Sequence, residues 1–185
     1  MTDAVRAFGD ALRDRRIRRR KQRYIAGATA TLIAALGLTI GLAPHPRLLW
    51  NASASAPIGL WRVAPGTPVT RGDIVVARLP EPWRGLAARR RYLPANVPLI
   101  KRVAAEPGDR ICATGAAVTV NGIAVAIRRA TDGAGRPMPL WQGCRTLHDG
   151  AVLLLMDDPM SFDGRYFGPT ARSDIIGKAY PLWLR

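Results

Sequence analysis

A run of small residues with alternating serines begins at Asn51. In the segment Asn51-Ala-Ser-Ala-Ser55-Ala-Pro-Ile-Gly59, a proline and a glycine interrupt any regular element. A serine on such a backbone can expose its hydroxyl, and neighbouring N–H groups are free to hold an oxyanion. The segment therefore predicts a nucleophilic serine. The alternative is an ordinary linker rich in serine and alanine.

A lysine lies among aliphatic residues in a second segment, Leu99-Ile-Lys101-Arg-Val103. If this segment is a strand, Leu99, Lys101 and Val103 share one face. An inward-facing lysine loses its hydration, which lowers its pKa and leaves more of the amine neutral. A neutral amine can take the proton from a serine hydroxyl, so a Ser–Lys dyad needs no histidine. The alternative is a lysine that reaches solvent at a strand edge.

The two histidines, His45 and His148, do not have the spacing of a metal-binding pair, and the sequence contains no Cys/His cluster. We therefore expect no metal and no cofactor. A Ser-His-Asp triad that uses His148 remains an alternative to the dyad.

Three ordered motifs resemble those of the type I signal peptidases (peptidase S26), which are serine peptidases with a Ser/Lys dyad. The motifs are Asn-x-Ser-x-Ser-x-Pro-x-Gly-Leu-Trp-Arg at 51–62, Leu-Ile-Lys-Arg-Val-x-x-x-Pro-Gly-Asp at 99–109, and Ser-Phe-Asp-Gly-Arg-Tyr-Phe-Gly-Pro at 161–169. They are most similar to the conjugative-transfer branch, the TraF-like pilin-processing peptidases. The resemblance implies a membrane-anchored endopeptidase that processes an exported precursor, a conjugative pilin, by hydrolysis or by cyclising acyl transfer. The alternative is a non-catalytic, membrane-anchored assembly component of a conjugation or secretion apparatus.

The resemblance also implies roles for individual residues. Ser55 matches the nucleophile and Lys101 the general base. Ser53 matches the serine whose hydroxyl joins the nucleophile's own N–H in the oxyanion hole, and Ser161 matches the serine that orients the lysine amine.

Asp163 and Arg165 match an ion pair that shapes the site, and they share one face if their segment is extended. Two departures from the family pattern stand nearby. Gly164 occupies the position of a second serine, and Met156-Asp-Asp158 stands where Gly-Asp-Asn is common.

The positive charge is concentrated at the start of the chain. The 185 residues include 28 Lys+Arg and 13 Asp+Glu, a net charge of +15, which suggests nucleic acid or a negatively charged membrane as a partner. Residues 1–23 hold nine basic and three acidic residues. Few aromatic residues interleave this basic leader, so we expect no nucleic-acid partner.

Residues 24–43 contain no charged side chain. As a helix they span about 30 Å, the thickness of a bilayer's hydrocarbon core. The positive-inside rule then places 1–23 in the cytoplasm and 44–185 in the periplasm of a bacterium, with one anchor in the inner membrane. A buried soluble helix and a cleaved signal peptide are the alternatives.

The rest of the chain predicts a mainly β, antiparallel domain over 44–185. Asn121-Gly122 between two apolar runs is typical of a hairpin, and Pro107-Gly108 of a type II turn. The segment 80–98 predicts an exposed irregular loop whose aromatic side chains face the membrane. The predicted strands are 60–64, 73–79, 99–104, 110–113, 117–120, 123–127, 151–156 and 175–184.

The two cysteines, Cys112 and Cys144, are 32 residues apart and flank the predicted hairpin. In an oxidising periplasm we expect them to pair, which would stabilise the domain by about 3–4 kcal/mol. Two buried free thiols are the alternative.

Overall fold

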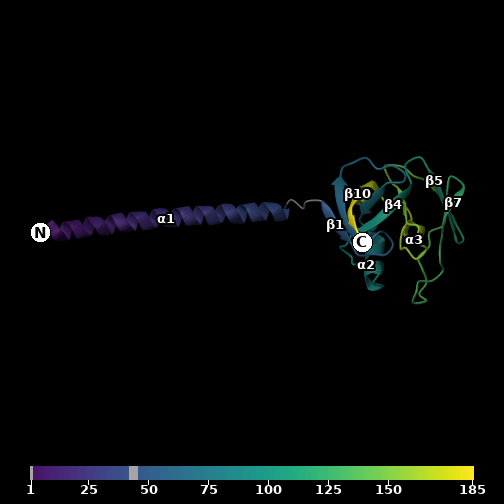
Figure 1. Cartoon of the computed structure of the whole chain (residues 1–185), viewed down its shortest axis with the longest axis horizontal. Helices are drawn as coiled ribbons and strands as arrows, with labels where there is room; N and C mark the ends of the chain where they lie inside the picture. Colours follow the sequence, from purple (N-terminus) through teal and green to yellow (C-terminus); the bar gives the residue numbers. More distant parts are fainter. Residues whose placement is uncertain (1, 42–45) are drawn as a thin grey trace. The chain divides into compact units, whose positions relative to one another are not determined.

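The computed structural model describes residues 2–41 and 46–185, and the chain forms two compact units, Met1–Pro44 and His45–Arg185 (Figure 1). The first unit is the helix α1, Thr2–Gly41. Within the described residues, no helix combines the length and the apolar character needed to cross a membrane. The anchor predicted over 24–43 therefore finds no support here. Its last two residues, and the predicted start of the β domain at 44, lie outside the described residues.

The second unit contains two antiparallel sheets, so the mainly β class is confirmed. Figure 1 shows β1, β4 and β10 on one side of the unit and β5 and β7 on the other. The six-stranded sheet has the order β1-β2-β10-β3-β4-β9, with bounds Leu48–Asn51, Gly59–Pro65, Ile175–Leu184, Ile74–Ala77, Leu99–Ala105 and Leu153–Leu155. The four-stranded sheet has the order β7-β6-β5-β8, with bounds Ile123–Ile127, Ala117–Val120, Arg110–Thr114 and Gly143–Thr146.

Both predicted turns are confirmed. Val120 pairs with Ile123, so β6 and β7 are joined by the two residues Asn121 and Gly122, both with positive φ (50° and 85°) as a type I′ turn requires. Gly108 has φ 97°, and the Asp109 N–H donates to the Glu106 carbonyl oxygen at 3.1 Å. The residues within each turn thus determine the conformation of these two connections.

The irregular loop predicted over 80–98 is wrong in its first half, which forms the helix α2, Glu81–Arg89. Pro82 lies in the first turn, where the missing N–H of proline leaves no helical bond unmade. The nine residues are too few to display three helical turns in the sequence. Trp83, Tyr92 and Leu93 are partly buried and pack against a core cluster. The expectation that aromatic side chains of this segment face the membrane stays a prediction.

The strand that carries Lys101 lies between two apolar clusters. Leu99 and Val103, on the same face as Lys101, pack with Val75 and Leu154, whereas Ile100 packs on the other face in a separate cluster. The predicted alternation of this strand is therefore confirmed. A rigid, buried strand holds the lysine.

Candidate active site

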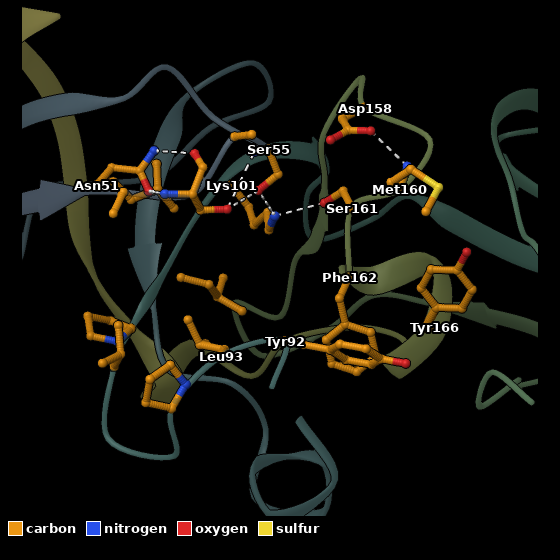
Figure 2. Close-up of a pocket in the computed structure, with 18 of the residues that line it drawn as sticks. Asn51, Ser55, Tyr92, Leu93, Lys101, Asp158, Met160, Ser161, Phe162 and Tyr166 are labelled. Atoms are coloured by element: carbon orange, nitrogen blue, oxygen red, sulfur yellow. Dashed lines mark hydrogen bonds between the residues drawn. The ribbon is translucent and has the colours of Figure 1, made fainter. Parts of the chain in front are cut away.

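The structure brings Ser55, Lys101 and Ser161 together. The Lys101 Nζ donates hydrogen bonds to Ser55 Oγ at 2.9 Å and to Ser161 Oγ at 2.7 Å (Figure 2). Ser55 lies in the irregular segment after β1, Lys101 in the middle of β4, and Ser161 in the loop before the short helix α3, Gly164–Phe167. The three side chains thus come from three segments that are distant in sequence.

Lys101 is buried, with only 4% of its surface exposed. Burial lowers the pKa of Lys101 from 10.5 to about 8, because the interior solvates the ammonium poorly. The nearby Asp163 and Asp158 carboxylates oppose this shift of the pKa, whereas the Arg165 guanidinium adds to it. A substantial fraction of the amine is therefore neutral just above neutral pH, as a general base requires.

Two hydrogen-bond donors lie beside the Ser55 hydroxyl. Ser53 Oγ lies 3.0 Å from Ser55 Oγ, and the Ser55 N–H donates to Ser53 Oγ at 3.4 Å. The Ser53 hydroxyl and the Ser55 N–H therefore lie next to each other beside the Ser55 hydroxyl. A carbonyl oxygen placed between them can accept from both, which is the arrangement of an oxyanion hole.

Asn51 also belongs to this site, although the sequence motifs suggest no role for it. Its Nδ2 lies 3.0 Å from the carbonyl oxygens of Ser53, Ala56 and Pro57, and its Oδ1 accepts from the Ser53 N–H at 3.1 Å. The sequence signals are its place at the start of the first motif and its position directly before a turn, which is a common place for side chain to backbone bonds.

Asp163 and Arg165 form a buried ion pair, with 0% and 3% of their surfaces exposed. Arg165 Nε and Nη2 donate to the two Asp163 carboxylate oxygens at 2.8 and 3.1 Å. The segment is not extended: Asp163 caps α3 by accepting from the Arg165 N–H at 3.1 Å. Asp163 also accepts from the Met156 N–H at 3.0 Å. The pair thus joins the end of β9 to the segment that carries Ser161.

The two departures from the family pattern have structural counterparts. A Cβ on Gly164 would lie 2.7 Å from the Leu154 carbonyl oxygen and 2.8 Å from Leu153 Cδ1, so this position has no room for a side chain. Asp157 pairs with Arg102 at 2.8 Å, and Asp158 lines the cavity that contains the lysine.

A cavity of about 630 Å³ opens beside Ser55 and Lys101. Figure 2 shows Tyr92, Phe162 and Tyr166 grouped on one side of it and the serines and Lys101 on the other. Tyr92, Phe162 and Tyr166 form consecutive ring contacts at 5.0 and 6.0 Å between centroids. Further apolar lining comes from Leu49, Trp50, Leu93, Pro94, Val97, Pro98, Leu99, Ile100, Met138 and Met160.

The connection between β7 and β8 forms part of the cavity wall. Asp132 in this connection accepts hydrogen bonds from the Tyr92 hydroxyl and from Arg136 Nε, the latter at 2.7 Å. The bond from Tyr92 is the main reason that the pKa of Asp132 lies well below its ordinary value. Arg90 Nη1 donates to the Pro137 carbonyl oxygen at 2.8 Å. These contacts hold the wall against the segment after α2.

The two cysteines of the chain, Cys112 and Cys144, form a disulfide between paired positions of β5 and β8, with an S–S distance of 2.06 Å. Of the residues that the structure describes, no group of three His, Cys, Asp or Glu side chains is suited to hold a metal ion. His148 does not line the cavity beside Ser55, so the alternative triad has no support from His148 there.

The chain is similar in sequence to known signal peptidases and conjugal transfer proteins. A family model described as signal peptidase, peptidase S26, matches residues 20–183. The plasmid transfer protein TraF of Escherichia coli is 35% identical over 177 residues, covering 88% of this chain and 96% of that protein. The probable conjugal transfer protein TraF of Sinorhizobium fredii (strain NBRC 101917 / NGR234) is 36% identical over 175 residues, covering 88% and 90%. A crystal structure of a signal peptidase I from Enterococcus faecalis V583 matches with a TM-score of 0.35 and 18% identity, over 60% of this chain and 97% of that one.

Proposed function

The chain belongs to the peptidase S26 family of signal peptidases, and from this premise we propose that it is a serine endopeptidase with a catalytic dyad of Ser55 and Lys101. The observation that carries the proposal is the 2.9 Å contact between Lys101 Nζ and Ser55 Oγ at the edge of a large cavity. Nucleophilic catalysis requires a nucleophile and a base within hydrogen-bond distance, and a third group that orients the base. In this proposal the third group is Ser161.

In the acylation step, neutral Lys101 takes the proton of the Ser55 hydroxyl while Oγ bonds to the scissile carbonyl carbon. The resulting oxyanion accepts hydrogen bonds from the Ser55 N–H and the Ser53 hydroxyl. Collapse of this intermediate breaks the C–N bond, and the Lys101 ammonium gives its proton to the leaving amine. An ester between the substrate and Ser55 remains, and Ser161 holds the Lys101 amine throughout.

The ester is resolved by the reverse sequence of steps. Water or an amine attacks the ester carbonyl and gives a proton to Lys101, which returns it to Ser55 Oγ as the ester bond breaks. Attack by water yields a free carboxylate, and attack by an amine of the same substrate chain yields a circular product.

The substrate in this proposal is an exported precursor that belongs to a conjugation apparatus, namely a pilin subunit. The names of the two relatives, plasmid transfer and conjugal transfer proteins, support the link to a conjugation apparatus. The aromatic and aliphatic lining of the cavity supports a cleavage segment with apolar side chains, because such side chains gain free energy when they leave water.

We also propose that residues 24–43 attach the protein to the bacterial inner membrane, with 1–23 in the cytoplasm and the β domain in the periplasm. The uncharged stretch and the basic leader support the attachment, as do the exposed Ile25, Leu32 and Ile33 of α1. The disulfide supports an oxidising compartment. Fractionation of cells tests this proposal. Release of the protein by an alkaline carbonate wash would contradict it.

The dyad is tested by producing the chain together with a candidate pilin precursor and following the precursor by mass spectrometry. Ser55→Ala and Lys101→Ala should each abolish processing, while Ser173→Ala, at an exposed serine, should leave it unchanged. A circular product is lighter than the hydrolysed one by one water, so the same measurement separates the two outcomes. Processing by either dyad variant would contradict the proposal and favour an assembly component.

A further inference from the structure

We propose that Asn51 is a positioning residue that holds the turn around Ser55 in its reactive geometry. The proposal rests on the proposed function, because it concerns the same nucleophile. Asn51 is the last residue of β1, and its backbone pairs with Gly59 of β2. It is only 8% exposed. Its side chain therefore projects from the ordered sheet into the irregular turn.

The contacts of Asn51 bracket the nucleophile on both sides. Nδ2 lies 3.0 Å from the carbonyl oxygen of Ser53, two residues before Ser55, and 3.0 Å from those of Ala56 and Pro57, which follow it. Oδ1 accepts from the Ser53 N–H at 3.1 Å. The two hydrogens of Nδ2 are shared among three acceptors, so every polar atom of the side chain is engaged with this turn.

These contacts hold the backbone of Ser53, whose hydroxyl is one of the two proposed oxyanion donors, and the backbone directly after Ser55. Each peptide group is planar, so holding both the N–H and the carbonyl oxygen of Ser53 fixes the two peptide groups on either side of its Cα, from which the Ser53 hydroxyl projects. Donors stabilise an oxyanion only when they already point at its position before reaction. Asn51 has no contact with the Ser55 hydroxyl among its hydrogen bonds, so it acts through Ser53 and the backbone of the turn.

The side-chain amide suits this position for a chemical reason. An aspartate has the same shape, but its oxygen would face three carbonyl oxygens, and oxygens of this kind are acceptors that repel one another. An alanine would leave these acceptors without the Asn51 donor. Trp61 Nε1 still donates to the Pro57 oxygen at 3.2 Å, and the Ala56 N–H to the Ser53 oxygen at 3.4 Å, so part of the turn remains held.

The test uses the purified full-length chain and p-nitrophenyl acetate, an activated ester whose carbonyl becomes an oxyanion when a serine attacks it. The burst of p-nitrophenol measures the acylation rate constant across a range of pH. Asn51→Ala and Asn51→Asp should each lower this constant by about 100-fold. The pH midpoint should stay near 8, because Lys101 remains buried. Asn96→Ala, at an exposed asparagine, should acylate at the wild-type rate.

An unchanged rate in either Asn51 variant would overturn the proposal. A lower rate together with a midpoint shifted toward 10.5 would also overturn it, because the effect would then act through the surroundings of Lys101. If Asn51→Ala does not unfold cooperatively, the acylation rate of the isosteric Asn51→Asp variant alone tests the proposal. If both variants lose the fold, Asn51 stabilises the whole domain, and the proposal that it positions the turn is refuted. A wild-type burst that persists in Ser55→Ala would instead refute the proposed function, and this proposal with it.

Discussion

At the scale of single residues, the proposed chemistry depends on a lysine that the protein keeps out of water. Lys101 shares its face of β4 with two buried aliphatic residues, and its amine is held by Ser55 and Ser161. Hydrogen bonds to two neutral hydroxyls compensate little for the lost hydration, so desolvation dominates the pKa of Lys101. Burial, and not a neighbouring acid, thus gives Lys101 the lowered pKa that the proposed general base needs.

Acylation should therefore depend on pH through Lys101. Only the neutral amine can accept the Ser55 proton, so the acylation rate constant should rise as the pH rises through about 8 and then reach a plateau. Lys101→Arg should be inactive at every pH, because a guanidinium does not lose its proton. Burst kinetics across the pH range measure both effects. A midpoint near 10.5 would show that Lys101 is hydrated in solution.

The buried pair Asp163–Arg165 should matter for stability far more than an exposed pair. Asp163→Ala leaves the Arg165 guanidinium buried without its partner, which should lower the free energy of unfolding by about 3–5 kcal/mol. Asp157→Ala removes an 80% exposed partner of Arg102 and should cost less than about 1 kcal/mol. Denaturant unfolding of the two variants gives the comparison. Equal losses would contradict the structural role of the buried pair.

At the scale of elements, the site depends on how closely α3 approaches β9. Gly164 opens α3, and its Cα lies against the backbone of Leu154. The absence of a side chain permits this approach, which brings Asp163 to the Met156 N–H. The glycine that departs from the family pattern thus has a packing role in this chain.

Gly164→Ala should consequently destabilise the domain. The added Cβ would lie 2.7 Å from a backbone oxygen that cannot move alone, and such overpacking costs about 1–3 kcal/mol. Gly133→Ala is a matched control, because a Cβ there meets nothing within 4 Å. Thermal unfolding of both variants measures the difference. An unchanged midpoint for Gly164→Ala would show that α3 can retreat from β9.

The disulfide between β5 and β8 should contribute to the stability of the four-stranded sheet. Replacing both Cys112 and Cys144 by serine should lower the free energy of unfolding by about 3–4 kcal/mol, because the bond closes a loop of 32 residues in the unfolded chain. Thiol labelling of the unfolded, non-reduced protein should detect no free cysteine. Two labelled cysteines would refute the bond.

At the scale of the whole molecule, the two units divide the proposed tasks. The residues of the dyad and the lining of its cavity all belong to His45–Arg185, whereas the basic segment and the uncharged segment belong to Met1–Pro44. Catalysis and attachment therefore use different parts of the chain.

A chain that lacks residues 1–44 should fold and should be acylated by p-nitrophenyl acetate at the rate of the full chain. The reason is that the hydrogen bonds of the dyad and the disulfide are all made within the second unit. Denaturant unfolding and burst kinetics of the truncated chain test this expectation. A truncated chain with a cooperative unfolding transition but no burst would show that the first unit contributes to the site.

The sequence by itself determined the strands and their turns, because alternation and turn chemistry depend on neighbouring residues. Eight of the ten strands in the described residues follow from the sequence. The other two, β1 and β8, are short and carry no alternating pattern that could predict them. The order of the three motifs also sufficed to select Ser55, Lys101 and Ser161 as candidates.

Only the tertiary structure decided what surrounds these residues. The 2.9 Å contact of the dyad joins residues that are far apart in the sequence. The lack of room at Gly164 results from its packing against Leu153 and Leu154 of another element. The sequence did not predict the helix α2 for a similar reason. Packing against the core stabilises this helix, and its sequence has no long periodic pattern. Contacts and burial depend on which surfaces meet, and local sequence does not encode that choice.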